Sequence, residues 1–148
     1  MAIVVDSNVL IFSIPEGHPW QEDSINAIER WLLANETIYV LPQNLAEFRN
    51  VCTRPANKNG LGLTVEEAEK RLNHLESLLT VLHDTPLAYS QWRRLIVQHG
   101  VKGVQVHNTR IAAAMQTHGV NQILTYNPRD FPRYKAISPV HPSAPVDG

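Results

Sequence analysis

Short apolar runs alternate with longer amphipathic segments along this chain, a pattern that predicts alternating strands and helices. The run Ile3-Val4-Val5 is β-branched, as is typical of strands buried on both faces of a parallel sheet. Similar runs predict three further strands, and a weaker run predicts a fifth, at 37–41, 79–82, 122–125 and 135–137. Because parallel strands need long crossover connections, the alternation predicts an α/β fold.

The segments between these runs carry helical start and stop signals. Thr64 and Glu67 form a capping-box sequence, and the apolar residues after it recur at spacings of three and four. Pro42 suits the first turn of a helix that runs to about Thr53. Three more helices are expected at 22–34, 86–99 and about 106–118, the last of them stopped by Gly119.

Length and composition indicate one domain. The chain has 148 residues without a repeat or linker, and its 43% hydrophobic content excludes a disordered protein. No apolar run reaches the roughly 18 residues of a membrane span, the first residues do not look like a signal peptide, and the single Cys52 excludes an internal disulfide. We expect a cytoplasmic protein with its domain over 1–138 and, because the last ten residues hold three prolines, a disordered tail over 139–148.

The formal net charge of -1 conceals an asymmetry. Residues 1–84 carry six Lys/Arg against twelve Asp/Glu, whereas residues 85–148 carry seven against two. Polyanion binding depends on local charge, so the near-neutral total does not exclude a nucleic-acid partner. A chance partition of surface charge explains the asymmetry equally well.

Polar side chains follow two of the predicted strands. Asp6 stands directly after the first strand, and Thr125, Asn127 and Asp130 leave the fourth. Ligands of open parallel sheets bind beyond the carboxyl ends of the strands, which makes these residues candidates for a site. Each also has an ordinary explanation, because Asp and Asn commonly build and cap turns.

Two further candidates lie on predicted helices. Glu47 borders the apolar stripe of the helix that begins at Pro42, a position also typical of a solvated glutamate. Asn108 precedes the apolar run at Ile111 and fits a helix N-cap. No second histidine stands at helical spacing from His107, which argues against a metal-binding histidine pair there.

Four segments carry the candidate residues: Asp-Ser-Asn-Val-Leu from Asp6, Asn-Leu-Ala-Glu-Phe around Glu47, Val-His-Asn-Thr-Arg around Asn108, and Thr-Tyr-Asn-Pro-Arg-Asp-Phe from Thr125. In this order and spacing they resemble the PIN domain family, especially its VapC-type toxin ribonucleases, over residues 3–137. The resemblance implies a five-stranded parallel sheet with helices on both faces. It also implies cleavage of RNA with Mg²⁺ or Mn²⁺ held by clustered acids.

By position, the resemblance assigns four catalytic and metal-binding residues and three polar supports. The former are Asp6, Glu47, Asn108 and Asp130, and the latter are Ser7, Thr125 and Asn127. Asn108 departs from the family, which usually has an aspartate there. An amide oxygen can bind a metal but brings no negative charge, and hard oxygen sites tune affinity by ligand charge. We therefore expect weak or undetectable cleavage.

The implied site has a simple physical basis. Clustered carboxylates repel one another unless their pKa values rise or a divalent cation neutralises them. Oxygen ligands suit Mg²⁺ or Mn²⁺ rather than zinc, and such a cation activates water for attack on a phosphate. Candidate contacts to flanking RNA phosphates are Arg110, Arg129 and Arg133.

The resemblance also implies protein partners. VapC-type proteins usually form homodimers and are blocked by a small VapB-like antitoxin, whose tail fills the active cleft, often with a basic side chain. The acidic residues 1–84 are complementary to such a basic partner.

Two other enzyme classes fit less well, and one non-enzymatic interpretation stays open. A haloacid-dehalogenase-type phosphatase needs a second aspartate where Asn8 stands, and a receiver domain needs an acidic pair after the first strand. The remaining alternative is a PIN-like module that binds RNA or a protein without cleaving. Asn108 is the residue that favours this alternative.

Overall fold

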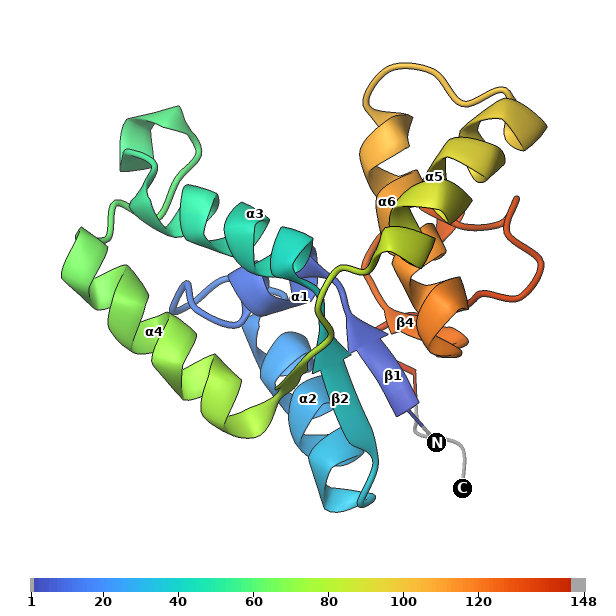
Figure 1. The fold of residues 1–148 in the computed structure, drawn as a ribbon. Helices are drawn as coiled ribbons and strands as arrows, with labels where there is room; N and C mark the ends of the chain where they lie inside the picture. Colours follow the sequence, from blue (N-terminus) through green and yellow to red (C-terminus); the bar gives the residue numbers. More distant parts are fainter. Residues whose placement is uncertain (1, 145–148) are drawn as a thin grey trace.

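Five parallel strands form a single sheet in the computed structural model, which describes residues 2–144 (Figure 1). The strands are β1 (Ala2–Val5), β2 (Thr37–Val40), β3 (Thr80–Val81), β4 (Gln122–Leu124) and β5 (Ser138–Val140). Their order is β3-β2-β1-β4-β5, and all four pairings are parallel. The predicted α/β class and parallel sheet are confirmed. The central position of β1 explains why Ile3, Val4 and Val5 are fully buried.

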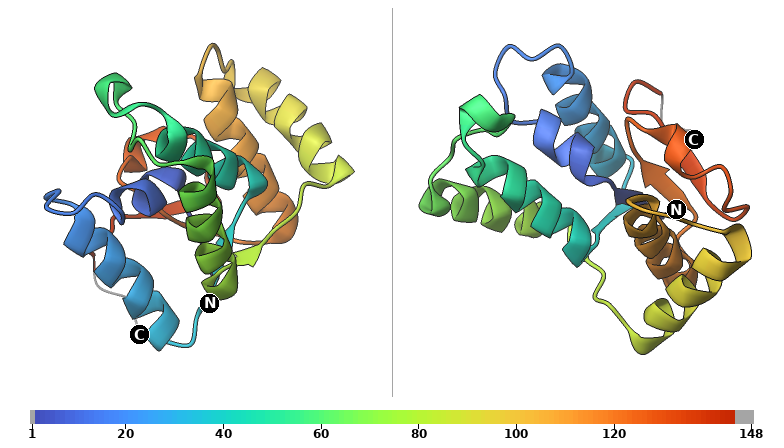
Figure 2. Two further views of the ribbon diagram at one scale, coloured as in Figure 1. Left: turned by 90° about the vertical axis from the view of Figure 1, so that its left-hand side faces the viewer. Right: turned by 90° about the horizontal axis from the view of Figure 1, so that it is seen from above.

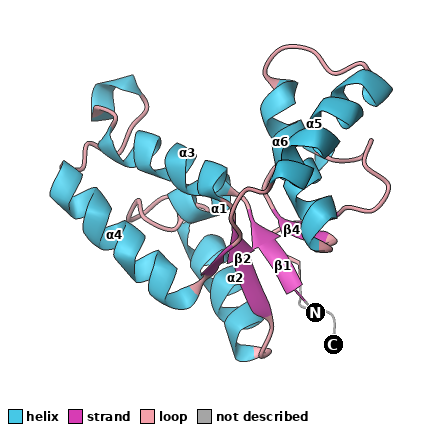
Figure 3. Cartoon of the chain, viewed as in Figure 1, coloured by secondary structure: helices cyan, strands magenta, loops and turns pink. Residues whose placement is uncertain are grey.

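Helices cover both faces of the sheet (Figures 2 and 3). They are α1 (Ser7–Phe12), α2 (Gln21–Leu33), α3 (Pro42–Thr53), α4 (Val65–Leu78), α5 (Pro86–His99) and α6 (Gln105–His118), with short 3₁₀ helices at Ala56–Lys58 and Pro128–Asp130. Side chains alternate across β1, so Ile3 and Val5 pack with α1 to α4, whereas Val4 packs with α5 and α6. The result is a three-layer sandwich.

Local signals in the sequence account for the helix ends. The Thr64 hydroxyl accepts from the Glu67 backbone N–H at 3.1 Å, and the Glu67 carboxylate accepts from the Thr64 N–H at 3.2 Å, as a capping box requires. Gly119 ends α6 with φ of 70°, in the left-handed region that glycine adopts without strain. The five predicted helices are confirmed, with shifts of one or two residues at some ends.

The predicted position of the fifth strand is wrong. Residues 135–137 form no strand; β5 runs over Ser138–Val140 and pairs with β4. The Ile137 side chain packs instead in the core formed with α5 and α6. Pro139 made a strand there look unfavourable, but β5 lies at the edge of the sheet, where a proline is tolerated.

The predicted disordered tail is wrong for residues 139–144. These residues include part of β5, and the Arg30 guanidinium donates to the carbonyl oxygens of Pro142 at 2.6 Å and Ala144 at 3.3 Å. The rest of the predicted tail, residues 145–148, lies outside the described residues. Within residues 2–144, no helix is long and apolar enough to cross a membrane.

Candidate active site at the carboxyl edge of the sheet

Asp6 lies where β1 ends and α1 begins, beside the end of β4. Its backbone N–H donates to the Leu124 carbonyl at 2.9 Å, which continues the β1–β4 pairing. Its side chain caps α1 and is only 6% exposed. Asp6 is therefore both a helix cap and a candidate site residue, because capping α1 holds its carboxylate at the carboxyl edge of the sheet.

A network of donors fixes the orientation of the Asp6 carboxylate. The Ser7 backbone N–H donates to Oδ1 at 2.8 Å, and the Thr125 hydroxyl donates to Oδ2 at 2.8 Å. The Asn8 amide donates to Oδ2 at 3.4 Å and to Thr125 Oγ1 at 3.3 Å, and its oxygen accepts from the Tyr126 N–H. The ends of β1 and β4 are thereby joined around one buried carboxylate.

Burial raises the pKa of Asp6 to about 6. Desolvation of the charged form is the largest cause, and the negative charges of Glu47 and Asp130 add to it. The hydrogen bonds from Thr125 and Ser7 act in the opposite direction. Asp6 therefore ionises within the physiological range at some cost in free energy, which a bound cation would offset.

Glu47 reaches the same place from α3. Ser7 Oγ donates to Glu47 Oε2 at 2.8 Å and lies 3.5 Å from Asp6 Oδ1. These two short contacts place the carboxylates well within the roughly 10 Å limit for joint coordination of one ion. Gln43, one turn earlier on α3, donates to Glu47 Oε1 at 3.0 Å and holds it in position.

Asp130 and Asn127 lie next to this pair, in the turn after β4. Asp130 ends the 3₁₀ helix, and its charge contributes to the raised pKa of Asp6. Asn127 contacts the site through its backbone N–H, which donates to Thr125 Oγ1 at 3.0 Å. The two residues also line a pocket of about 640 Å³, together with Tyr126, Pro128, Arg129 and His141.

Asn108 lies inside α6 and does not cap it. The helix begins at Gln105 after Val104, and Asn108 Nδ2 donates to Gln105 Oε1 at 3.2 Å. The N-cap alternative is therefore wrong. The first turn of α6 nevertheless adjoins the site, because Gln43 donates to the His107 carbonyl at 2.9 Å as well as to Glu47.

A family model of the PIN domain matches residues 3–137. The chain belongs to the PIN domain family. No curated protein matches it in sequence. The Asp6 and Glu47 carboxylates therefore lie at the carboxyl edge of the sheet of a PIN domain.

Solved structures agree in fold with this PIN domain. VapBC2 from Rickettsia felis, bound to a DNA fragment of its promoter, aligns with a TM-score of 0.68 and 19% identity over 95% of this chain and 98% of that chain. FitAcB from Neisseria gonorrhoeae gives 0.62 and 20% over 95% and 97%. VapC20 from Mycobacterium tuberculosis, a Sarcin-Ricin loop cleaving toxin, gives 0.59 and 16% over 82% and 86%. At these identities the likeness shows the shared fold.

The donors of this PIN domain suit a hard divalent cation. Among residues 2–144, no three His, Cys, Asp or Glu side chains gather closely enough to form a complete metal cage. Asp6 and Glu47 are nevertheless joined through Ser7, and both offer carboxylate oxygens as metal ligands. Mg²⁺ commonly takes one or two carboxylates and keeps several waters, so this pair fits such an ion.

The three arginines predicted to contact RNA differ in setting. Arg129 lines the pocket that contains Asp130, and Arg133 is exposed three residues beyond the 3₁₀ helix. Arg110 projects from α6 and pairs with Asp84 at 3.5 Å. The structure thus places Arg129 in the pocket lined by Asn127 and Asp130, and Arg110 on α6 beside Asp84.

Sequence reasoning missed two positioning residues of this PIN domain. Asn8 holds both Asp6 and Thr125, and Gln43 holds Glu47. Gln43 and Glu47 are four residues apart, a spacing at which helical side chains meet, so this signal was available. Asn8 gave no comparable signal, because its role depends on the pairing of β1 with β4.

Proposed function

We propose that this PIN domain is a metal-dependent endoribonuclease of the VapC toxin type. The observation that carries the proposal is the buried Asp6 carboxylate, which Ser7 joins to Glu47 at the carboxyl edge of the sheet. Maintaining a carboxylate there is unfavourable for folding alone, since burial raises its pKa to about 6. A site for a cation explains why such a group is held so firmly.

In this proposal Asp6 and Glu47 bind Mg²⁺ or Mn²⁺, and Asp130 adds negative charge. When bound, such a cation supplies activated water and stabilises negative charge on the phosphate under attack. Ser7, Thr125 and Asn8 orient the Asp6 carboxylate through their hydrogen bonds. Arg129 and Arg133 hold flanking phosphates of the RNA, a role that positions the strand without reading its sequence.

Asn108 is the residue that limits activity in this proposal. At the third acidic position it offers a neutral amide in place of a carboxylate. Affinity of hard oxygen sites follows ligand charge, so the chain as written binds metal weakly and cleaves slowly. Asn108 equally supports the second candidate, a PIN-like module that binds RNA or a protein without cleaving.

We also propose a small VapB-like antitoxin as partner, together with a homodimer that acts in the cytoplasm. Structural neighbours include a toxin-antitoxin complex from Klebsiella pneumoniae as well as VapBC2 and FitAcB. Residues 1–84, with six Lys/Arg against twelve Asp/Glu, present negative charge to a basic inhibitory segment. The RNA substrate is consistent with a cytoplasmic site of action.

Cleavage of a structured RNA in Mn²⁺ tests the proposed activity. Asn108→Asp should raise the cleavage rate at least tenfold, roughly 1.4 kcal/mol of transition-state stabilisation. It should also tighten Mn²⁺ binding, and Asp6→Ala in that background should abolish both. Glu69→Gln is the matched control, because it removes a half-exposed acid that pairs with Arg49. Equal, measurable rates for the chain as written and Asn108→Asp would overturn the catalytic assignment of Asn108, and no cleavage by either protein would support the non-cleaving module.

A further inference from the structure

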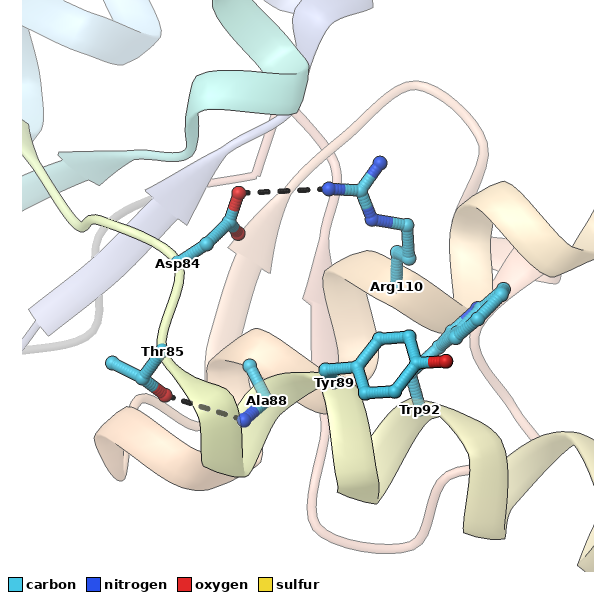
Figure 4. A pocket seen from close by; sticks show the side chains of 6 residues that line it. All are labelled: Asp84, Thr85, Ala88, Tyr89, Trp92 and Arg110. Carbon is cyan, nitrogen blue, oxygen red and sulfur yellow. Dashed lines mark hydrogen bonds and ion pairs between the residues drawn. The ribbon is translucent and has the colours of Figure 1, made fainter.

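A second pocket lies between the start of α5 and α6, on the other helical layer (Figure 4). Its volume is about 360 Å³, near the lower end of the range of roughly 300–1,000 Å³ for small-ligand sites. It is lined by Asp84, Thr85, Ala88, Tyr89, Trp92 and Arg110. The sequence alone indicates no role for this place beyond a phosphate contact by Arg110.

Two aromatic rings form one wall of this pocket. The Trp92 ring is fixed, because its Nε1 donates to the Val106 carbonyl at 2.8 Å. The Tyr89 ring lies beside it with a centroid distance of 5.9 Å and an interplanar angle of 41°, and Tyr89 is 60% exposed. An exposed ring next to an anchored one is a surface on which a planar aromatic ligand can stack.

Opposite charges meet at the same pocket. Arg110 Nη2 lies 3.5 Å from Asp84 Oδ2, and both side chains are about half exposed. Figure 4 shows the two side chains reaching toward each other from α6 and from the segment before α5. An exposed ion pair of this kind is worth little, so a phosphate can replace Asp84 as the partner of Arg110 at small cost.

The helical hairpin that builds the pocket is positively charged. Residues 86–118 contain Arg93, Arg94, Lys102 and Arg110, and they contain no Asp or Glu. This charge favours a polyanion and disfavours a basic peptide such as the inhibitory segment proposed above. The chemistry of the hairpin therefore points to a nucleic acid.

The pocket is linked directly to the candidate active site. His107 and Arg110 lie one turn apart on α6, and the His107 carbonyl accepts from Gln43, which also holds Glu47. Gln43 therefore connects the Glu47 carboxylate to the first turn of α6, and Arg110 lies one further turn along that helix.

We propose that this pocket binds one unpaired nucleobase of the RNA substrate, which stacks on Tyr89 while Arg110 contacts an adjacent phosphate. The inference rests on the proposed ribonuclease function and adds a substrate subsite to it. The substrate class is RNA with a single-stranded or looped-out segment, because only an unpaired base can leave its stack to enter the pocket. Tyr89 is a positioning residue in this account and takes no part in the chemical step.

Binding to a short fluorescein-labelled single-stranded RNA tests the pocket, measured by fluorescence anisotropy in EDTA so that no cleavage occurs. Tyr89→Leu, which keeps apolar bulk but removes the ring, should weaken binding about tenfold, since stacking is worth ~1–3 kcal/mol per base. Tyr89→Phe should bind like the wild type. Leu87→Ala is the matched control on α5, because Leu87 is 70% exposed and does not line the pocket.

The Asp84–Arg110 pair gives a second readout. Arg110→Gln should lower the slope of log affinity against log salt by about one, as the loss of one phosphate contact requires. Asp84→Asn should strengthen binding, because it frees Arg110 and removes a negative charge. A purely structural role of the pair would leave the salt slope unchanged, and that result would overturn the phosphate contact.

The outcomes separate this inference from the proposed function. If the wild type fails to bind RNA, the ribonuclease proposal fails and the base pocket fails with it. If the wild type binds and Tyr89→Leu binds equally well, the pocket inference is wrong while the ribonuclease proposal stands. If Tyr89→Leu and Leu87→Ala change the sedimentation of the protein but not its RNA affinity, the surface joins two copies of the chain, and the inference is likewise overturned.

Discussion

Replacing Asp6 by asparagine should stabilise the metal-free protein at neutral pH. The folded state holds the Asp6 carboxyl with a pKa raised from 3.8 to about 6, mainly through burial. A carboxyl whose pKa is raised by folding contributes stability below its unfolded pKa and loses that contribution as the pH rises through its folded pKa. The free energy of unfolding of the wild type should therefore fall between about pH 4 and pH 6 as Asp6 ionises. Asp6→Asn lacks this carboxyl and should not show that fall.

The size of the effect follows from the same shift. One pKa unit corresponds to 1.36 kcal/mol, so a rise from 3.8 to about 6 amounts to about 3 kcal/mol across this pH window. The amide that Asp6→Asn introduces would still accept from the Ser7 N–H but would not accept equally well from Thr125, a loss of about 1 kcal/mol at every pH. We expect Asp6→Asn to be about 2 kcal/mol more stable than the wild type at pH 7.5 and about 1 kcal/mol less stable at pH 4.

Urea denaturation of both proteins in a chelating buffer at several pH values measures this difference. The stability difference should change sign between pH 4 and pH 7.5. In a separate series without chelator, Mn²⁺ at pH 7.5 should stabilise the wild type and leave Asp6→Asn unchanged, because the ion binds the native carboxylate pair. A difference that stays constant with pH would refute the claim that burial of Asp6 is unfavourable.

Three further substitutions give independent checks. In the Asn108→Asp background, Glu47→Gln should weaken Mn²⁺ binding at least tenfold in isothermal titration calorimetry, since it removes one of two joined carboxylates; unchanged affinity would exclude Glu47 as a ligand. Thr64→Ala should lower the free energy of unfolding by about 1 kcal/mol through loss of the capping box. Phe131→Ala should lower it by about 3–5 kcal/mol, because the fully buried ring packs under α5 and α6; a loss below 1 kcal/mol would contradict that packing.

The sequence predicts the central part of the fold well, because its signals there are local. The β-branched run Ile3-Val4-Val5, the capping box at Thr64 and the first-turn Pro42 each indicate an element without knowledge of its neighbours. β5 was misplaced because its stability comes from pairing with β4 at the sheet edge, which outweighs the poor strand propensity around Pro139. The six-residue α1 was missed because Asp6-Ser7 resembles an ordinary turn.

The candidate site shows the same division between local and tertiary information. Asp6 and Thr125 were predicted from their places after two strands, and the β1–β4 pairing brings them together. Asn108 was interpreted as a possible cap because it precedes the apolar run at Ile111, whereas α6 begins three residues earlier, at Gln105, after Val104 and without a side-chain cap. The bridge of Ser7 between Asp6 and Glu47 depends on the packing of α1 against α3, which no sequence spacing encodes.

The position of Mn²⁺ in a crystal tests the central claim most directly. Anomalous scattering from crystals soaked in Mn²⁺ should show an ion within about 2.0–2.6 Å of carboxylate oxygens of both Asp6 and Glu47. The same soak of Asn108→Asp should raise the occupancy of that ion. Manganese bound elsewhere, with none between these two carboxylates in either protein, would contradict the account.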